Sequence, residues 1–156
     1  MYSMSIDPSI RNCGWAIWKG TKLKDFGVFH STTRDKDWQV TGQNIAALVK
    51  VKGTEYEVEK VWCEYPGFFG ANVTAKSGAL VKLAWFVGFL DGLFTPDFIP
   101  FVLVRVVDWK GNLPKIVVQG RIERLLKRNI ITRMKTMPPD VFDAVGLGLW
   151  VHRRMS

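Results

Sequence analysis

Four acidic residues interrupt or end strongly hydrophobic segments of the chain, where a charge is out of place. Asp7 closes the first apolar segment, Glu64 closes a second, and Asp140 and Asp143 lie close together near the C-terminus. A carboxylate in such a position has to be paired, solvated or bound to a cation. Hard divalent cations such as Mg²⁺ prefer carboxylate oxygens, and two-metal centres that cleave phosphodiesters use several carboxylates around ions about 4 Å apart. The four acids are therefore candidate ligands of a metal centre.

Each acid taken alone also has an ordinary structural interpretation. Asp7 precedes a proline and could open a turn, and Glu64 could be a solvated strand end. Asp140 could be an acid that the helix dipole favours at a helix N-terminus, and Asp143 could be a surface residue. The metal-centre hypothesis therefore depends on their joint occurrence.

The overall charge indicates the kind of partner. The chain of 156 residues has 22 Lys and Arg against 14 Asp and Glu, a formal net charge of +8. Without the four candidate ligands, 22 basic residues face 10 acidic ones, a net charge of +12. An acidic cluster in so basic a chain suits metal ions that meet a polyphosphate. We therefore expect nucleic acid as the partner.

Hydrophobic periodicity and turn-forming residues predict the elements that position the acids. The expected strands cover residues 2–6, 14–18, 24–29, 58–63 and 101–107. The expected helices cover residues 37–51, 72–94, 114–128 and 139–153. Three antiparallel strands, then a helix, a strand, a helix, a strand and closing helices is the element order of the RNase H-like α/β fold. We expect a single RNase H-like nuclease domain over residues 1–156, built on a five-stranded mixed sheet flanked by helices.

This fold would bring the four acids together. If the fourth strand lies beside the first and runs parallel to it, Asp7 and Glu64 end at the same edge of the sheet, where open α/β sheets place their sites. Asp140 and Asp143 are three residues apart on a helix, so they share one of its faces and can both reach that edge.

Four stretches of the sequence resemble the motifs of one family, the RuvC-type Holliday junction resolvases, including its phage-encoded branch. Ser-Ile-Asp-Pro-Ser-Ile-Arg-Asn-Cys-Gly-Trp-Ala-Ile (5–17) resembles the first motif, Val-Trp-Cys-Glu-Tyr-Pro (61–66) the second, and Asp-Val-Phe-Asp-Ala-Val-Gly-Leu-Gly (140–148) the last. Pro114-Lys115, at the start of a basic helix, resembles the segment with the catalytic lysine. The chain departs from the family at Ser9, where Gly is usual, and at residues 108–112, which replace a Gly-rich run.

The resemblance implies a Mg²⁺-dependent endonuclease that resolves Holliday junctions by paired incisions and leaves 5′-phosphate ends. The four acids would hold two Mg²⁺ ions, or Mn²⁺, of which one activates water and the other stabilises the leaving 3′-oxygen. Lys115 would be the catalytic lysine, with Lys110 as the competing candidate. A lysine at a helix start is unfavourable for the dipole, which favours a functional role over that of a solvated surface residue.

Aromatic and basic side chains are the expected DNA contacts. Phe68 and Phe69 would either fill a core pocket or stack on unstacked bases at the junction crossover, and the family's use of an aromatic in this loop favours stacking. The expected phosphate contacts flank the acids in the sequence: Lys110, Lys115, Arg121, Arg124, Lys127 and Arg128. The ordinary alternative for such a basic cluster is a solvated face.

The helix expected over residues 72–94 is apolar on more than one face. A second buried face favours a twofold homodimer, which suits paired incisions, whereas the alternative is deep burial within one copy. Its apolar run, Leu83 to Leu90, is shorter than the ~20 residues that cross a bilayer. No basic region followed by an apolar stretch opens the chain, so we expect a cytoplasmic protein, in the host cytoplasm if phage-encoded. Cys13 and Cys63 are expected as core residues.

Two other functions fit the same residues. The first is a broader nuclease on this fold, which cuts other branched DNA or RNA–DNA hybrids. The second is a non-catalytic relative that only binds nucleic acid, although such a protein gains nothing from four negative charges that face phosphate. Substrate profiling separates the first alternative from a junction resolvase.

Overall fold

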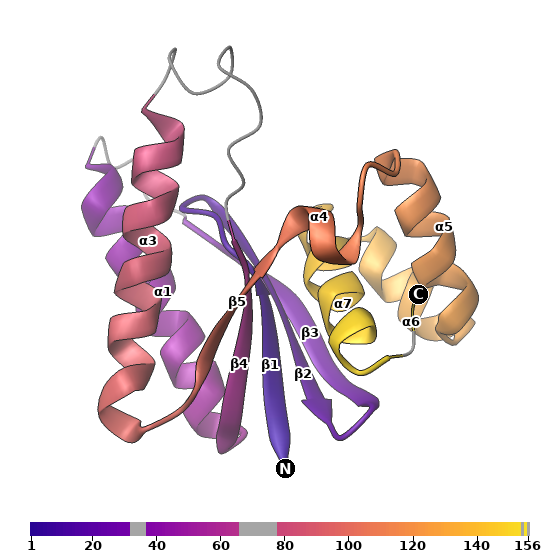
Figure 1. Cartoon of the computed structure of the whole chain (residues 1–156), viewed down its shortest axis with the longest axis horizontal. Helices are drawn as coiled ribbons and strands as arrows, with labels where there is room; N and C mark the ends of the chain where they lie inside the picture. Colours follow the sequence, from indigo (N-terminus) through magenta and orange to yellow (C-terminus); the bar gives the residue numbers. More distant parts are fainter. Residues whose placement is uncertain (32–36, 66–77, 154, 156) are drawn as a thin grey trace.

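The computed structural model describes residues 1–31, 37–65, 78–153 and 155 and centres on a five-stranded sheet (Figure 1). The strand order is β3-β2-β1-β4-β5. β1 pairs antiparallel with β2 and β2 with β3, whereas β4 runs parallel to β1 and β5 runs parallel to β4. The strands are β1 (Tyr2–Asp7), β2 (Asn12–Lys19), β3 (Lys22–His30), β4 (Val58–Tyr65) and β5 (Phe101–Arg105). The predicted five-stranded mixed sheet is confirmed.

Helices cover both faces of the sheet, with α1 and α3 on one side and α5, α6 and α7 on the other (Figure 1). The first pair is α1 (Trp38–Glu55) and α3 (Ala79–Phe94), after which η1 (Thr95–Asp97) leads towards β5. The remaining helices are α4 (Val106–Trp109), α5 (Lys115–Leu125), α6 (Arg128–Lys135) and α7 (Asp140–Val151). Buried apolar residues form two clusters, one on each face of the sheet. Cys13 and Cys63 are free and buried, as expected.

Two element predictions are wrong in detail. The strand expected over residues 101–107 ends at Arg105, because the chain turns there into the short helix α4. The helix expected over residues 114–128 ends at Leu125, where Leu126 and Lys127 take extended backbone conformations, and a separate helix α6 follows. α3 begins at Ala79, after Gly78 in a left-handed conformation, and residues 72–77 of the expected helix lie outside the described part of the chain.

A buried polar contact fixes α7 on the sheet. The hydroxyl of Ser5 in β1 donates to the carbonyl oxygen of Ala144 in α7 at 2.7 Å and accepts the indole N–H of Trp18 in β2 at 2.9 Å. A Cβ on Gly148 would lie 2.2 Å from that indole nitrogen, so the helix can sit this close only with glycine there. β1, β2 and α7 are therefore held in one fixed arrangement.

α3 packs in the core with one face and presents apolar groups on another. Phe86, Leu90 and Phe94 are fully buried, whereas Val81 is 71% exposed. The stretch Ala79–Asp97 is long and apolar enough to cross a membrane by length and composition, so the expectation that this region is too short is wrong in those terms. Four of its side chains, those of Phe86, Val87, Leu90 and Phe94, lie in the core cluster on the α1 side of the sheet, so one face of α3 packs in the core.

Candidate metal centre

Asp7 and Glu64 lie at the carboxyl ends of neighbouring parallel strands. The register of β1 and β4 pairs Ile6 with Cys63, so Asp7 and Glu64 occupy the next position on each strand. Successive side chains of a strand alternate between faces, and Ile6 and Cys63 belong to the core cluster on the α1 side. Asp7 and Glu64 therefore face the opposite side, where α7 packs.

The first turn of α7 brings the second pair of acids to the same edge. α7 begins at Asp140, and Gly14 of β2 is the cross-strand partner of Asp7. A Cβ on Gly14 would lie 2.3 Å from the carbonyl oxygen of Asp140, so the helix start rests directly on the strand. The structure thus places all four predicted acids around one end of β1 and β4.

Both candidate lysines contact the same acid. The ammonium groups of Lys110 and Lys115 each lie 3.3 Å from a carboxylate oxygen of Asp143. Lys110 also lies 3.3 Å from Oε2 of Glu64 and is 20% exposed, whereas Lys115 is 59% exposed. Lys110 follows α4 and Lys115 begins α5. The sequence left open which of Lys110 and Lys115 is the catalytic lysine, and the structure places both beside Asp143.

Trp109 is a residue of the site that the sequence analysis missed. Its indole N–H donates to Oε2 of Glu64 at 3.0 Å, and the side chain is only 5% exposed. The one signal in the sequence was a tryptophan directly before a candidate catalytic lysine, within the stretch that departs from the family pattern.

Ser9 stabilises the turn that follows Asp7 through its side chain. Its hydroxyl accepts the backbone N–H groups of Arg11 and Asn12, both at 3.3 Å. The side chain thereby closes the turn between β1 and β2, immediately after Asp7. The connection next to the acids is therefore held by side-chain hydrogen bonds.

The acids form a strongly negative environment that the protein neutralises only in part. Burial raises the pKa of Asp7 well above its usual value, and Glu64 and Asp143 raise it further. Burial also raises the pKa of Glu64, against the lowering by Lys110. Burial disfavours the charge of Lys110, but Glu64 and Asp143 outweigh it and raise the pKa of this lysine. A cation is thus held between two acids, and it also lowers the pKa of Asp7, although burial and the neighbouring acids keep that pKa raised.

The donor set suits a hard divalent cation, since it consists of four carboxylates. Within the described residues, no three Asp, Glu, His or Cys side chains come close enough to ligate one ion in this conformation. The ammonium of Lys110 lies between Glu64 and Asp143 instead. Burial is the largest cause of the raised pKa of Asp7, and Glu64 and Asp143 add repulsion to it. A cation bound beside these carboxylates would relieve that repulsion, which favours a metal here.

The other predicted DNA contacts lie farther along α5 and α6. Arg121 and Arg124 are on α5, Arg128 begins α6, and Lys127 precedes it. Lys127 and Lys22 line a hollow of about 500 Å³ near the β2–β3 turn. Phe68 and Phe69 lie outside the described residues.

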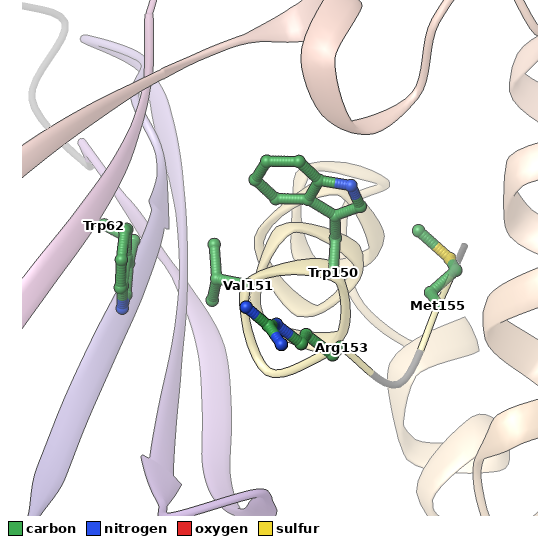
Figure 2. Close-up of a pocket in the computed structure, with 5 residues that line it drawn as sticks. All are labelled: Trp62, Trp150, Val151, Arg153 and Met155. Carbon is green, nitrogen blue, oxygen red and sulfur yellow. The ribbon is translucent and has the colours of Figure 1, made fainter.

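A second groove lies away from the acids, at the other end of α7. Trp62, Trp150, Val151, Arg153 and Met155 line its volume of about 480 Å³ (Figure 2). Trp150 follows Asp143 by seven residues, which is about 10 Å along a helix. Figure 2 shows Trp62 on β4 facing the end of α7 across this groove.

The sheet order and the flanking helices define the protein as a member of the RNase H-like fold class, as predicted. The structure matches RuvC of Thermus thermophilus in complex with a Holliday junction substrate with a TM-score of 0.70 at 17% identity, covering 99% of this chain and 96% of that one. It matches the Fowlpox virus resolvase, solved with Holliday junction DNA, with a TM-score of 0.63 at 22% identity, covering 98% and 97%.

Sequence similarity points to the same group of proteins. The chain is 28% identical, over an alignment of 167 positions, to the crossover junction endodeoxyribonuclease RuvC of Helicobacter pylori, covering all of this chain and 99% of that protein. It is 22% identical to the protein of the same name from Helicobacter hepaticus, covering all of this chain and 85% of that one. No family model matches the chain.

Proposed function

We propose that this protein is a metal-dependent DNA endonuclease that resolves Holliday junctions by paired incisions, and that it belongs to the phage-encoded branch of RuvC-type resolvases. The observation that carries the proposal is the meeting of Asp7 and Glu64, on adjacent parallel strands, with the acidic first turn of α7. Similarity to RuvC over the whole chain supports the choice of substrate. The compact, divergent chain is the reason for the choice of branch.

The chemistry follows from the acids and lysines of the site. Two Mg²⁺ ions held by the four acids would supply activated water and stabilise the charge on the leaving 3′-oxygen. Lys110, already between Glu64 and Asp143, would move towards the scissile phosphate as its acidic partners engage metal. Lys115, on the exposed side of Asp143, would contact the phosphate from solvent. The products would carry 5′-phosphates.

The proposed DNA surface extends from the site along α5 and α6. Lys115 opens α5 beside the acids, and the remaining cations follow on α5, on α6 and, for Lys127, between the two: Arg121, Arg124, Lys127 and Arg128. Phosphate contacts of this kind fix the position of the DNA without reading its sequence. Phe68 and Phe69 would stack on bases freed at the crossover.

The exposed apolar face of α3 supports the proposal of a twofold homodimer. Val81 is largely exposed, and Trp85, Phe89 and Leu93 are only partly buried. A second copy that covers this face would place two sites on one junction, as paired incisions require. The alternative of complete burial within one copy does not match the exposure of Val81.

A broader nuclease that cuts flaps, three-way junctions or RNA–DNA hybrids is the second candidate, since the same fold and acids serve it. The test incubates the protein with Mg²⁺ and a labelled immobile four-way junction, alongside duplex, flap, three-way and hybrid substrates. We expect symmetrical paired cuts in the four-way junction and much slower cleavage of the others. Comparable cleavage of every branched substrate would favour the broader nuclease. If none of the substrates is cut, the junction resolvase and the broader nuclease are both contradicted.

A further inference from the structure

We propose that Trp109 is a positioning residue of the metal centre, which holds Glu64 and Lys110 in their working orientations. The inference rests on the proposed function, because it concerns how this site binds metal. Trp109 neither contacts the reacting atoms nor offers a ligand, since an indole N–H can only donate. Its role would be exerted through the carboxylate and the ammonium group that it touches.

The first contact is a hydrogen bond that fixes a carboxylate. The indole N–H donates to Oε2 of Glu64 at 3.0 Å, and the Lys110 ammonium lies 3.3 Å from the same oxygen. Two donors on one oxygen restrict the rotation of the carboxylate about its terminal bond. Residues that orient metal-binding side chains in this way affect metal affinity without contacting the ion.

The second contact is with the lysine itself. The Lys110 ammonium lies 4.7 Å from the centre of the Trp109 ring, within the range of a cation–π interaction. The ring therefore stabilises the position of the cation that neutralises Glu64 and Asp143 in the absence of metal. One side chain thus acts on both charged partners.

The third contact ties this arrangement to α7. A Cβ on Gly146 would lie 2.8 Å from Cζ3 of the Trp109 ring, so the ring lies directly against the helix backbone. Gly146 follows Asp143 by three residues on the same helix face. Trp109 therefore connects the strand that carries Glu64, the segment that carries Lys110 and the helix that carries Asp143.

The test separates the hydrogen bond from the packing. Trp109→Phe keeps an aromatic ring and deletes the N–H donor. Trp15→Phe is the matched control, because Trp15 is 6% exposed and its Nε1 has no hydrogen-bond partner among the described residues. Mn²⁺ binding is measured by calorimetry on each protein without DNA, and junction cleavage with Mg²⁺ gives kcat and KM.

We expect Trp109→Phe to weaken Mn²⁺ binding and lower kcat by about 10-fold or more, with KM for the junction unchanged. Trp15→Phe should keep both values near wild type. Equal Mn²⁺ affinity and kcat in Trp109→Phe and wild type would overturn the inference. If wild type binds Mn²⁺ but cuts no branched DNA, the proposed function fails, and the Mn²⁺ affinities of the two variants still decide the role of Trp109.

Discussion

A Cβ placed on Gly14 would lie 2.3 Å from the carbonyl oxygen of Asp140 and 3.3 Å from the Cβ of Ala144. Gly14 is therefore the point at which the first turn of α7 rests on the sheet. Because Gly14 is also the cross-strand partner of Asp7, the same contact sets the separation between the strand acids and the helix acids. A backbone contact of this kind cannot be relieved by a rotamer change.

Gly14→Ala should displace the start of α7 and separate the acids. We expect a protein that still folds, because the Ser5–Ala144 hydrogen bond anchors the helix one turn later, but that cleaves junctions at least about 10²-fold more slowly. Gly92→Ala, on α3 with nothing within 4 Å of the added carbon and no left-handed backbone conformation, is the control for substitution of a glycine. Wild-type cleavage by a folded Gly14→Ala protein would contradict this account.

Removal of individual acids should abolish cleavage without unfolding the protein. Asp7→Asn, Glu64→Gln and Asp143→Asn each keep the size of the side chain and remove one negative ligand. We expect cleavage to fall by several orders of magnitude in each, with circular dichroism unchanged. Near wild-type cleavage by two of the three would rule out the metal-centre assignment.

The two lysines should differ in their contribution. Lys110 lies between Glu64 and Asp143, whereas the more exposed Lys115 pairs with Asp143 but not with Glu64. Loss of one transition-state donor costs roughly 10²–10³ in rate, so we expect Lys110→Ala to reach that range and Lys115→Ala to be milder. Single-turnover cleavage at saturating protein measures both. A larger loss in Lys115→Ala than in Lys110→Ala would favour Lys115 as the catalytic lysine.

The charge of Asp7 should destabilise the protein when metal is absent. Burial, Glu64 and Asp143 raise the pKa of Asp7, so stability that comes with its protonated form is lost as pH rises through that raised pKa. We expect Asp7→Asn to have a higher Tm than wild type in EDTA at neutral pH. The difference should vanish below about pH 3.8, the ordinary pKa of the residue. Scanning calorimetry of both proteins across this pH range measures the Tm difference, and a lower Tm for Asp7→Asn at neutral pH would contradict the prediction.

Charge at the site should also affect DNA binding. Asp7→Asn removes one repulsive charge from the site and leaves the basic surface unchanged, so in EDTA it should bind a four-way junction at least as tightly as wild type. Affinity should fall steeply with salt and exceed that for duplex of equal length. Gel-shift titrations at two salt concentrations measure both effects, and equal affinity for duplex and junction would favour the broader nuclease.

The apolar face of α3 should mediate self-association. We expect wild type to sediment as a dimer at micromolar concentration and Val81→Glu to sediment as a monomer. Ile116→Glu, at another highly exposed apolar position, on α5, is the control and should remain dimeric. Phe86 and Leu90 are unsuitable positions for this test, because both are fully buried and a charge there would unfold the monomer. A monomeric wild type that still makes paired cuts would contradict the prediction.

The sheet and the positions of the four acids could be predicted because each depends on a local pattern. Apolar segments that end in Asp7 and Glu64 are visible in the sequence, and the parallel pairing of β1 and β4 follows from the element order. The short helix α4 could not be predicted, since Val106 and Val107 favour a strand by propensity. Burial of Trp109 beneath α7 overrides that preference.

The break between α5 and α6 was missed for a similar reason. Residues 121–128 contain neither glycine nor proline, so nothing local ends the helix, and only the extended backbone at Leu126 and Lys127 separates the two helices. The role of Trp109 also depends on contacts with residues far along the chain. Sequence spacing gives no information on such contacts.

The hydrogen bond between Ser5 and Ala144 joins residues that are 139 positions apart. Contacts of such long range form late in folding, because the entropy of closing the intervening loop must be overcome first. Asp7 of β1 and Glu64 of β4 are therefore synthesised long before the two acids of α7. An unfinished chain holds only half of the acids, so catalytic competence would arise only in a protein that has completed its fold.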